Sequence, residues 1–371
     1  MNSILTISPN MRKELKLAFL ATFLLLLFPS NSNALEHKKP WATLCNGLLT
    51  FSYGYKPTLP SQISCPMCNR SMAYSSNYCG NCGRKNSKEF KVYEVPLAVQ
   101  RSDISSRDLH ERLEIYQEIG DKVPWHKDMP KVKRVTILPS FRNVTNITST
   151  SCWFSCDGLD EDCTLQFITG LENLNTSSVK YMACMFSDCE WVYSLNLSGF
   201  DTSNVRDMTG MFSNCSLLTA LELSSFNTTN VRYMSFMFSD CERVATLNLS
   251  RFNTQNVIDM TGMFYGCKKL SSLNVRGFNT RNVRSMMWMF FGCESLTSLN
   301  ISSFDMTQVE ATMCMFEDCK ALQTIYVSST KWDLKRAREN KNLDNYIILW
   351  EDYDSGTENM YENSPAKIVW K

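Results

Sequence analysis

The stretch LNLSGFDTSNVRDMTGMFSNCSLLTA at residues 195–220 decides the fold, because it returns almost unchanged as LNLSRFNTQNVIDMTGMFYGCKKLSS at residues 247–272. The sequence matches itself at a shift of 26 residues from about residue 163 to residue 327. Such a fixed period is typical of repeat architectures, in which each unit stacks on its neighbours. The most regular position is a cysteine, at Cys163, Cys189, Cys215, Cys241, Cys267, Cys293 and Cys319.

Each unit begins with a segment in which apolar and polar residues alternate. In the unit quoted first, Leu195 and Leu197 alternate with Ser194, Asn196 and Ser198. This period of two is typical of a strand that has one buried face. We therefore predict one strand per unit, and stacking of the units would join these strands into a parallel sheet.

A short helix is expected after each strand. Residues 201–204 read Asp-Thr-Ser-Asn, and such short polar side chains commonly cap the start of a helix. The apolar residues from Val205 to Cys215 then follow at spacings of 3, 3, 1 and 3, which would place them on one buried helical face. The residue before each cysteine tolerates a left-handed backbone and is expected to end the helix; these residues are Asp188, Asn214, Asp240, Gly266, Gly292 and Asp318.

The predicted fold class is therefore an α/β solenoid, a right-handed leucine-rich-repeat-like array with a parallel sheet. The two quoted units resemble the BspA-like leucine-rich-repeat surface proteins of bacteria, as do TSTSCWFSC at residues 148–156 and ITGLENLNTSSV at residues 168–179. The resemblance covers residues 135 to 328. It implies display on the cell surface and binding of macromolecules of a host or neighbouring cell, with extracellular-matrix proteins among the implied partners.

The polar residues between the strand leucines are the candidate ligand-binding residues, because they point away from the core onto the open face of the sheet. We expect the specific contacts to come from Glu222, Arg276 and Tyr326, because these residues differ from the asparagines and serines at the equivalent positions of the other units. The alternative is that these side chains only solvate the sheet and form local hydrogen bonds. The candidates are Asn196, Glu222, Asn248, Asn274, Arg276, Asn300 and Tyr326.

The repeat cysteines have two interpretations. Neighbouring units bring them close enough for disulfides, and an exported protein meets an oxidising compartment. The favoured interpretation is that each is a small buried apolar residue, and that the repeat methionines likewise fill the core. Cys152 and Cys156, just before the repeats, could also form a bridge.

A second cysteine pattern lies near the amino terminus, where Cys65-Pro-Met-Cys68 and Cys79-Gly-Asn-Cys82 form two Cys-x-x-Cys motifs. Two such turns can place four thiolates at the corners of a tetrahedron, which is the closed arrangement of structural zinc. The segment resembles a short zinc ribbon, and we predict that Cys65, Cys68, Cys79 and Cys82 bind a structural zinc ion. Two disulfides are the alternative outside the cell.

The remaining sequence suggests the order of the domains. Basic residues precede an apolar run of some twelve residues at 17–28, which is typical of a secretory signal peptide and too short for a membrane-spanning helix. Trp153 and Phe154 are expected to cover the apolar edge of the first unit. The predicted order is a signal peptide (1–34), a linker (35–60), the four-cysteine module (61–90), a helical connector (91–130), an amino-terminal cap (131–165), the repeats (166–328) and a carboxyl-terminal cap (329–371).

Composition excludes several function classes. The 38 Lys and Arg residues almost balance the 37 Asp and Glu residues, so the overall charge suggests neither nucleic acid nor an anionic membrane surface as a partner. The chain has three histidines, none of them in the repeats, and no constellation with catalytic spacing. We therefore expect a non-enzymatic protein. With the predicted signal peptide, the resemblance to the BspA-like proteins implies an exported, adhesin-like binding protein for an extracellular protein or glycan. The alternative is a structural envelope protein that associates with copies of itself.

Overall fold

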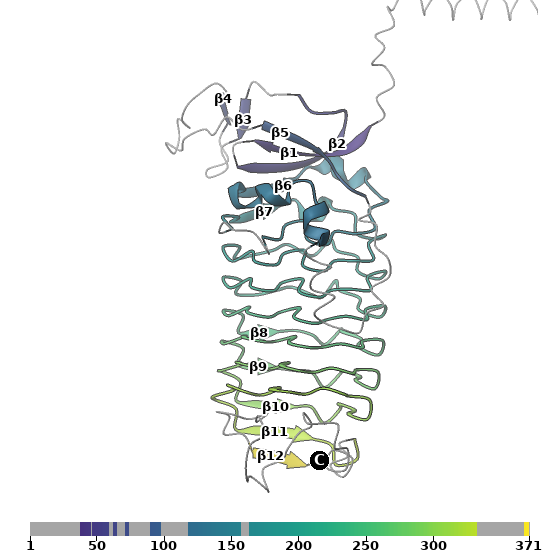
Figure 1. Cartoon of the computed structure of the whole chain (residues 1–371), viewed down its shortest axis with the longest axis vertical. Coiled ribbons are helices and arrows are strands. Elements are labelled where there is room, and N and C mark those ends of the chain that lie inside the picture. Colours follow the sequence, from purple (N-terminus) through teal and green to yellow (C-terminus); the bar gives the residue numbers. More distant parts are fainter. Residues whose placement is uncertain are drawn as a thin grey trace, which may run out of the picture.

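The computed structural model describes residues 38–45, 47–58, 62–64, 71–73, 90–97, 118–156, 163–331 and 367–370. The chain forms an elongated stack of coils, with a small sheet covering the end from which the repeats start (Figure 1). In the described residues, no helix is long and apolar enough to cross a membrane. The predicted signal peptide at residues 1–34 lies outside the described residues.

The sheet at the amino-terminal end has five strands in the order β5-β1-β2-β6-β7. A hairpin of β1 (Lys39–Cys45) and β2 (Leu48–Gly54) pairs antiparallel, and β5 (Phe90–Glu94) pairs antiparallel with β1. On the other side, β2 runs parallel to β6 (Arg134–Ile137), which runs parallel to β7 (Phe167–Thr169). The hairpin therefore extends the parallel sheet of the first coils.

This arrangement corrects the predicted linker. Residues 35–60 were expected to connect domains, yet they contain β1 and β2, whose alternating burial places Leu44, Leu49 and Phe51 in the core. The predicted connector at 91–130 includes most of β5, helical residues at 118–122 and a 3-10 helix, η1 (His126–Lys131). The end of the repeats is thus capped by chain from three separate segments, because the apolar edge of the first coil needs a partner.

Aromatic packing joins this cap to the array. Trp153, which is fully buried, stacks on Phe51 of β2 with a centroid distance of 5.7 Å, and Trp125 donates a hydrogen bond from Nε1 to the Trp153 carbonyl oxygen at 2.7 Å. Phe154 stacks on Phe186 of the first regular unit at 5.6 Å. The predicted role of Trp153 and Phe154 in covering the first coil is therefore confirmed. Two further 3-10 helices lie nearby, η2 (Pro139–Asn143) and η3 (Leu171–Asn173).

Short parallel strands follow one another along one side of the stack. They are β8 (Thr246–Leu247), β9 (Ser272–Leu273), β10 (Ser298–Asn300), β11 (Thr324–Val327) and β12 (Lys367–Trp370). Each of the pairs β8–β9, β10–β11 and β11–β12 is in register, so that Leu247 faces Leu273 and Leu299 faces Ile325. Residues 195–197 and 221–223, which were also predicted as strands, are not assigned to strands.

A second parallel ladder runs along another side of the stack. It consists of single bridges between residues 26 positions apart in sequence, or 32 for the first pair, one residue from each coil: Ser149, Tyr181, Asp207, Tyr233, Asp259, Ser285 and Ala311. We call this row the bridge ladder. The bridge ladder also passes through the coils of Asp207 and Tyr233, whose segments at 195–197 and 221–223 have no assigned strand pairing.

The helix predicted after each strand is wrong. Residues 201–218 form consecutive turns, in which Met211 N–H bonds to the Met208 carbonyl at 3.2 Å and Cys215 N–H to the Phe212 carbonyl at 3.3 Å. The amide of Phe212, which a helix would use internally, instead bonds to the Met237 carbonyl of the next unit at 3.0 Å. Because these amides bond to the next coil, the segment cannot close helical rings.

Two left-handed residues in each unit make this turn path. In the second regular unit they are Gly210 (φ 58°) and Asn214 (φ 53°). The left-handed conformation predicted for the residue before each cysteine is confirmed, since Asp188, Asn214, Asp240, Gly266, Gly292 and Asp318 all have positive φ. The earlier left-handed position was not expected. It bends the chain in the middle of the apolar run that was taken for a helical face.

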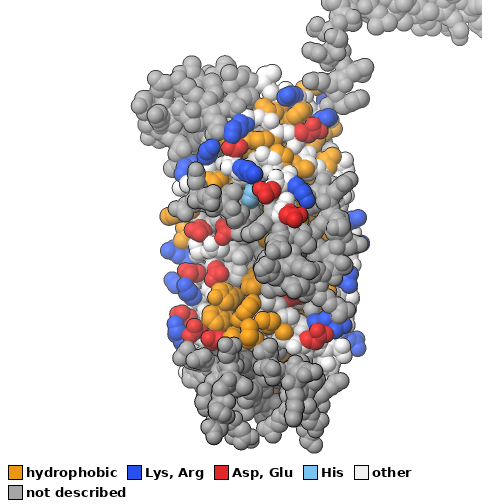
Figure 2. All heavy atoms as spheres, viewed as in Figure 1, with side chains coloured by type: hydrophobic (Ala, Val, Ile, Leu, Met, Phe, Trp, Pro, Cys, Tyr) orange, Lys and Arg blue, Asp and Glu red, His pale blue; other side chains and the backbone are white. Residues whose placement is uncertain are grey.

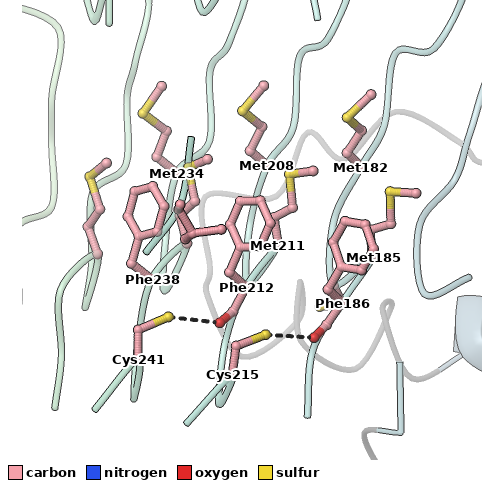
Figure 3. Close-up of a cluster of buried hydrophobic side chains, with 14 of the residues drawn as sticks. Met182, Met185, Phe186, Met208, Met211, Phe212, Cys215, Met234, Phe238 and Cys241 are labelled. Carbon is pink, nitrogen blue, oxygen red and sulfur yellow. Dashed lines mark hydrogen bonds between the residues drawn. The ribbon is translucent and has the colours of Figure 1, made fainter. Parts of the chain in front are cut away.

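The apolar residues of the turns are nevertheless buried as predicted. Met208, Met211, Phe212 and Cys215 are fully buried, and Figure 3 shows them in line with their equivalents from the neighbouring units. The phenylalanine rings form a continuous stack through the array, with centroids 5.5–5.8 Å apart from Phe186 to Phe316. Identical side chains one coil apart thus fill the core at regular intervals.

A ladder of buried threonines links each coil to the next through side-chain hydrogen bonds. Thr228 Oγ1 donates to the Asn253 carbonyl at 3.0 Å and accepts from the Asn253 amide at 2.8 Å. The same reciprocal pair occurs one unit on, between Thr254 and Asn279. Each hydroxyl therefore satisfies two backbone groups of the next coil, which would otherwise be left without partners in the interior. The ladder consists of Thr176, Thr202, Thr228, Thr254 and Thr280.

Candidate binding surfaces of the array

The predicted ligand-binding residues lie on the outer side of the strands. Asn196, Glu222, Asn248, Asn274 and Arg276 are exposed, whereas Asn300 and Tyr326 are half-buried. Asn300 and Tyr326 lie directly opposite each other in the β10–β11 pair. We call this row of residues the strand face. Its members come from successive units, so the array brings them together as one line of side chains.

Local hydrogen bonds hold the side chains of the strand face. Asn248 Oδ1 accepts from the Ser250 amide at 3.2 Å and from the Ser250 hydroxyl at 2.8 Å. Asn196 and Asn300 make the same pair of bonds with the serine two residues on. Glu222 accepts from the Ser224 amide at 2.9 Å, and these hydrogen bonds hold the pKa of its carboxyl below the usual range. The amide oxygens are thus engaged, while the amide N–H groups of the asparagines remain as donors.

Two exposed aromatic side chains lie beside the strand face at the amino-terminal end of the array. Trp191 is 52% exposed and Tyr193 is 53% exposed. The Tyr193 ring packs edge-on against Phe167 of β7 at 5.9 Å, and the Arg134 guanidinium lies 4.4 Å from the centroid of the Phe167 ring. Sequence reasoning missed this group. Its only sequence signal is that both residues differ in type from those at the same positions of later units.

The turns carry a second group of unexpected residues. Figure 2 shows hydrophobic side chains gathered on one face of the carboxyl-terminal half of the array. Half-buried apolar residues occupy turn positions at which the unit of residues 195–220 has Thr209, Gly210 and Ser213. They are Phe236, Tyr265, Met287, Trp288, Phe291 and Met313. Phe236 and Trp288 have positive φ values of 54° and 55°, which bulky residues rarely adopt. Tyr265 and Phe291 stack with centroids 4.8 Å apart.

The repeat cysteines from Cys189 to Cys293 are free, buried thiols. Each donates from Sγ to a backbone carbonyl of the preceding unit, as Cys241 does to Phe212 at 3.3 Å. Burial raises the pKa of the Cys241 thiol to about 12, with a smaller contribution in the same direction from the Asp240 carboxylate. A protonated, buried thiol is unsuited to nucleophilic or metal chemistry.

The disulfide of the described region joins Cys156 to Cys163. Cys152 was considered as the partner of Cys156, and Cys163 was counted as the first cysteine of the repeat ladder. Both expectations are wrong, because Cys163 lies just before the first complete coil and its Cα is 5.7 Å from that of Cys156. Its match to the 26-residue spacing therefore does not reflect an equivalent place in the core.

The four cysteines predicted to bind zinc, Cys65, Cys68, Cys79 and Cys82, lie outside the described residues. The strands beside the first motif are described: β3 (Gln62–Ser64) and β4 (Ser71–Ala73) pair antiparallel, with Ser64 opposite Ser71. In the sequence, Cys65 and Cys68 fall between these two strands. Among the described residues, no group of three or more His, Cys, Asp or Glu could hold a metal ion.

Comparison with known proteins gives one family. The sequence model of the family described as "Mycoplasma protein of unknown function, DUF285" matches residues 154–272 and 240–346. No curated protein matches the chain, and no solved structure matches it. The two matched stretches together span more than half of the chain and contain all of the regular units. The chain therefore belongs to the DUF285 family.

Proposed function

We propose that this protein is an exported, non-enzymatic binding protein, adhesin-like, that uses the strand face to bind an extracellular protein or glycan of a host or neighbouring cell. The array would be a leucine-rich-repeat-like solenoid related to the BspA-like surface proteins. Export rests on the predicted signal peptide, and the class of partner rests on the resemblance to those proteins.

One observation carries this proposal: the parallel register places equivalent polar side chains of successive units side by side on an outer surface. Local hydrogen bonds already fix the orientation of Asn196, Asn248 and Asn300. Side chains that are ordered before binding lose less conformational entropy when a partner arrives. A regular, pre-organised row suits an extended ligand or a large protein surface better than it suits a small molecule.

The test is a binding screen of the mature chain against immobilised matrix proteins and glycans. The variant Asn248→Ala/Asn274→Ala/Tyr326→Ala is compared with Gln255→Ala/Arg281→Ala, whose residues are exposed on turns and not on the strand face. The proposal expects the first variant to lose at least tenfold in affinity and the second to bind as the unaltered protein does. Equal binding by both variants would show that the binding site does not lie on the strand face.

The alternative is a structural envelope protein that associates with copies of itself. Sedimentation of the same preparation separates the two functions. The binding function expects a monomer that captures a ligand. Concentration-dependent assembly without any captured ligand would favour the structural function.

A further inference from the structure

A polar groove of 610 Å³ runs along the array beside the bridge ladder. Two rows of side chains line it, and each row takes one residue from each of several successive units. The first row consists of Asn204, Asn230, Asn256 and Asn282, and the second of Lys180, Arg206, Arg232, Ile258 and Arg284. The strand face does not contribute to this groove.

The asparagine row is fixed by hydrogen bonds between coils. Asn204 Nδ2 donates to the Ser177 carbonyl at 2.8 Å, and Asn230 Nδ2 donates to the Ser203 carbonyl at 2.7 Å. Asn256 and Asn282 repeat this bond further along. An amide nitrogen carries two hydrogens, so each of these side chains keeps one donor and its oxygen for a ligand. The row is a regular line of groups that can bind hydroxyls.

The cationic row is regular because its backbone is part of the stack. The Arg206 amide bonds to the Lys180 carbonyl at 2.8 Å, and the Arg232 amide bonds to the Arg206 carbonyl at 2.8 Å. Successive side chains therefore leave the array one strand spacing apart, ~4.8 Å. All three of these side chains are exposed. The chain thus presents three like charges in a line, although its formal net charge is only +1.

Three cations elsewhere in the array are paired with carboxylates. Lys268 pairs with Glu242 at 2.6 Å, Lys320 pairs with Glu294 at 2.8 Å, and Arg284 pairs with Glu310. Within the described part of the chain, no carboxylate forms an ion pair with Lys180, Arg206 or Arg232. Their mutual repulsion is therefore uncompensated there, and an anionic ligand that lies along the row would relieve it.

We propose that the groove from Lys180 to Arg232 binds a linear acidic polysaccharide that carries about one carboxylate or sulfate on each sugar residue. In such a polymer the anionic groups recur at a spacing close to that of the coils, and the sugar hydroxyls would meet the asparagine row. This proposal goes beyond the proposed function, since it assigns a ligand to a surface other than the strand face.

Two other polyanions fit less well. An extended acidic peptide repeats its side chains on one face every second residue, about 6.6 Å apart, which does not match the coil spacing. Single-stranded nucleic acid is usually held by aromatic rings that stack on the bases, and the residues described as lining the groove include none. An acidic polysaccharide carries both the anionic groups and the hydroxyls that the two rows can bind, and it needs no aromatic rings.

The experiment measures binding of the full chain to a heparin oligosaccharide, as the sulfated probe, and to an oligogalacturonate, as the carboxylate probe. Uncharged dextran, polyglutamate and a single-stranded oligonucleotide serve as comparison ligands. Arg206→Gln/Arg232→Gln should weaken binding of an acidic polysaccharide at least tenfold. Arg243→Gln/Arg251→Gln removes the same charge from exposed positions outside the groove and should leave binding within twofold.

A gain of affinity provides a second test. Ile258 interrupts the cationic row, and Ile258→Arg should strengthen binding and steepen its dependence on salt. Thermal unfolding of each variant shows that the fold is kept. Equal weakening by both double variants, no binding to either acidic polysaccharide, or preference for the oligonucleotide or polyglutamate would overturn the proposal. Loss of binding only in the strand-face variant would also overturn it, while leaving the proposed function standing.

Discussion

The thiol of Cys215 lies 3.2 Å from the carbonyl oxygen of Phe186 in the preceding unit, to which it donates a hydrogen bond (Figure 3). Burial raises the pKa of this thiol well above its ordinary value, and the neighbouring cysteines add to the effect. In the folded chain, Cys189, Cys215, Cys241, Cys267 and Cys293 should therefore not react with iodoacetamide at pH 8. Mass spectrometry of native and urea-unfolded samples checks this prediction, and modification of these residues in the native sample would contradict it.

The same thiols should make the array sensitive to alkali. The pKa of Cys241 is raised from its ordinary 9.0 to about 12 by burial, so the folded state keeps a proton that the unfolded state loses. Stability is unaffected below about pH 9 and should fall as the pH rises toward 12. Urea unfolding at several pH values measures this loss. The variant Cys241→Ala should show a shallower decline, and an unchanged slope would exclude Cys241 as a contributor.

Replacing one ring of the phenylalanine stack should open a cavity. Phe238 is fully buried between Phe212 and Phe264, with centroid distances of 5.8 Å on both sides. Phe238→Ala is expected to lower the free energy of unfolding by about 3–5 kcal/mol. Phe291→Ala, at a half-buried turn position, should cost clearly less. Chemical denaturation of both variants gives the comparison, and equal losses would argue against a continuous core.

Gly262 should tolerate no side chain. Its φ is +57°, and a Cβ there would lie 2.2 Å from Cε1 of Phe236 in the preceding unit. Gly262→Ala should therefore lower stability by more than ~1 kcal/mol, since both the backbone and the neighbouring ring would have to shift. Gly277→Ala is the matched control, because a Cβ at that position meets nothing within 4 Å. Equal thermal midpoints for the two variants would refute the close approach.

The threonine ladder predicts a cost for losing one hydroxyl. Thr228→Val keeps the shape but removes the donor and acceptor that satisfy the amide and carbonyl of Asn253. The expected loss is roughly 1–3 kcal/mol, which is the cost of leaving buried polar groups unpaired. Thr229→Val, at a half-buried position next in sequence, should change the unfolding free energy little. A similar effect of both substitutions would show that the hydroxyl is not the cause.

We propose that Cys65, Cys68, Cys79 and Cys82 hold a structural zinc ion, and metal analysis tests this directly. Protein purified without chelator should contain one zinc per chain, and removal of the metal should expose four reactive thiols. Because all four ligands would be thiolates, the ion would stabilise the local fold and leave no open position for a substrate. Two disulfides in place of zinc, found by peptide mapping under non-reducing conditions, would contradict the proposal.

Much of the array was predictable from sequence, because equivalent positions of successive units have the same environment. The 26-residue period identified the buried phenylalanines, methionines and cysteines, and the residue types before each cysteine identified one left-handed position per unit. The prediction of a helix failed for a definite reason. Apolar residues three or four positions apart fit a helical face and also fit a chain of turns. Only the acceptors of the backbone amide hydrogen bonds distinguish the two structures.

The sequence by itself determined the period, the residues of the core and the polar row on the strand face, since these depend on side-chain type and spacing. Only the tertiary structure decided what lies side by side across coils. It pairs Cys156 with Cys163, adds the distant β1–β2 hairpin to the sheet, and aligns Lys180, Arg206 and Arg232 along one groove. The physical reason is that backbone hydrogen bonds between units join residues far apart in sequence and so decide which side chains become neighbours.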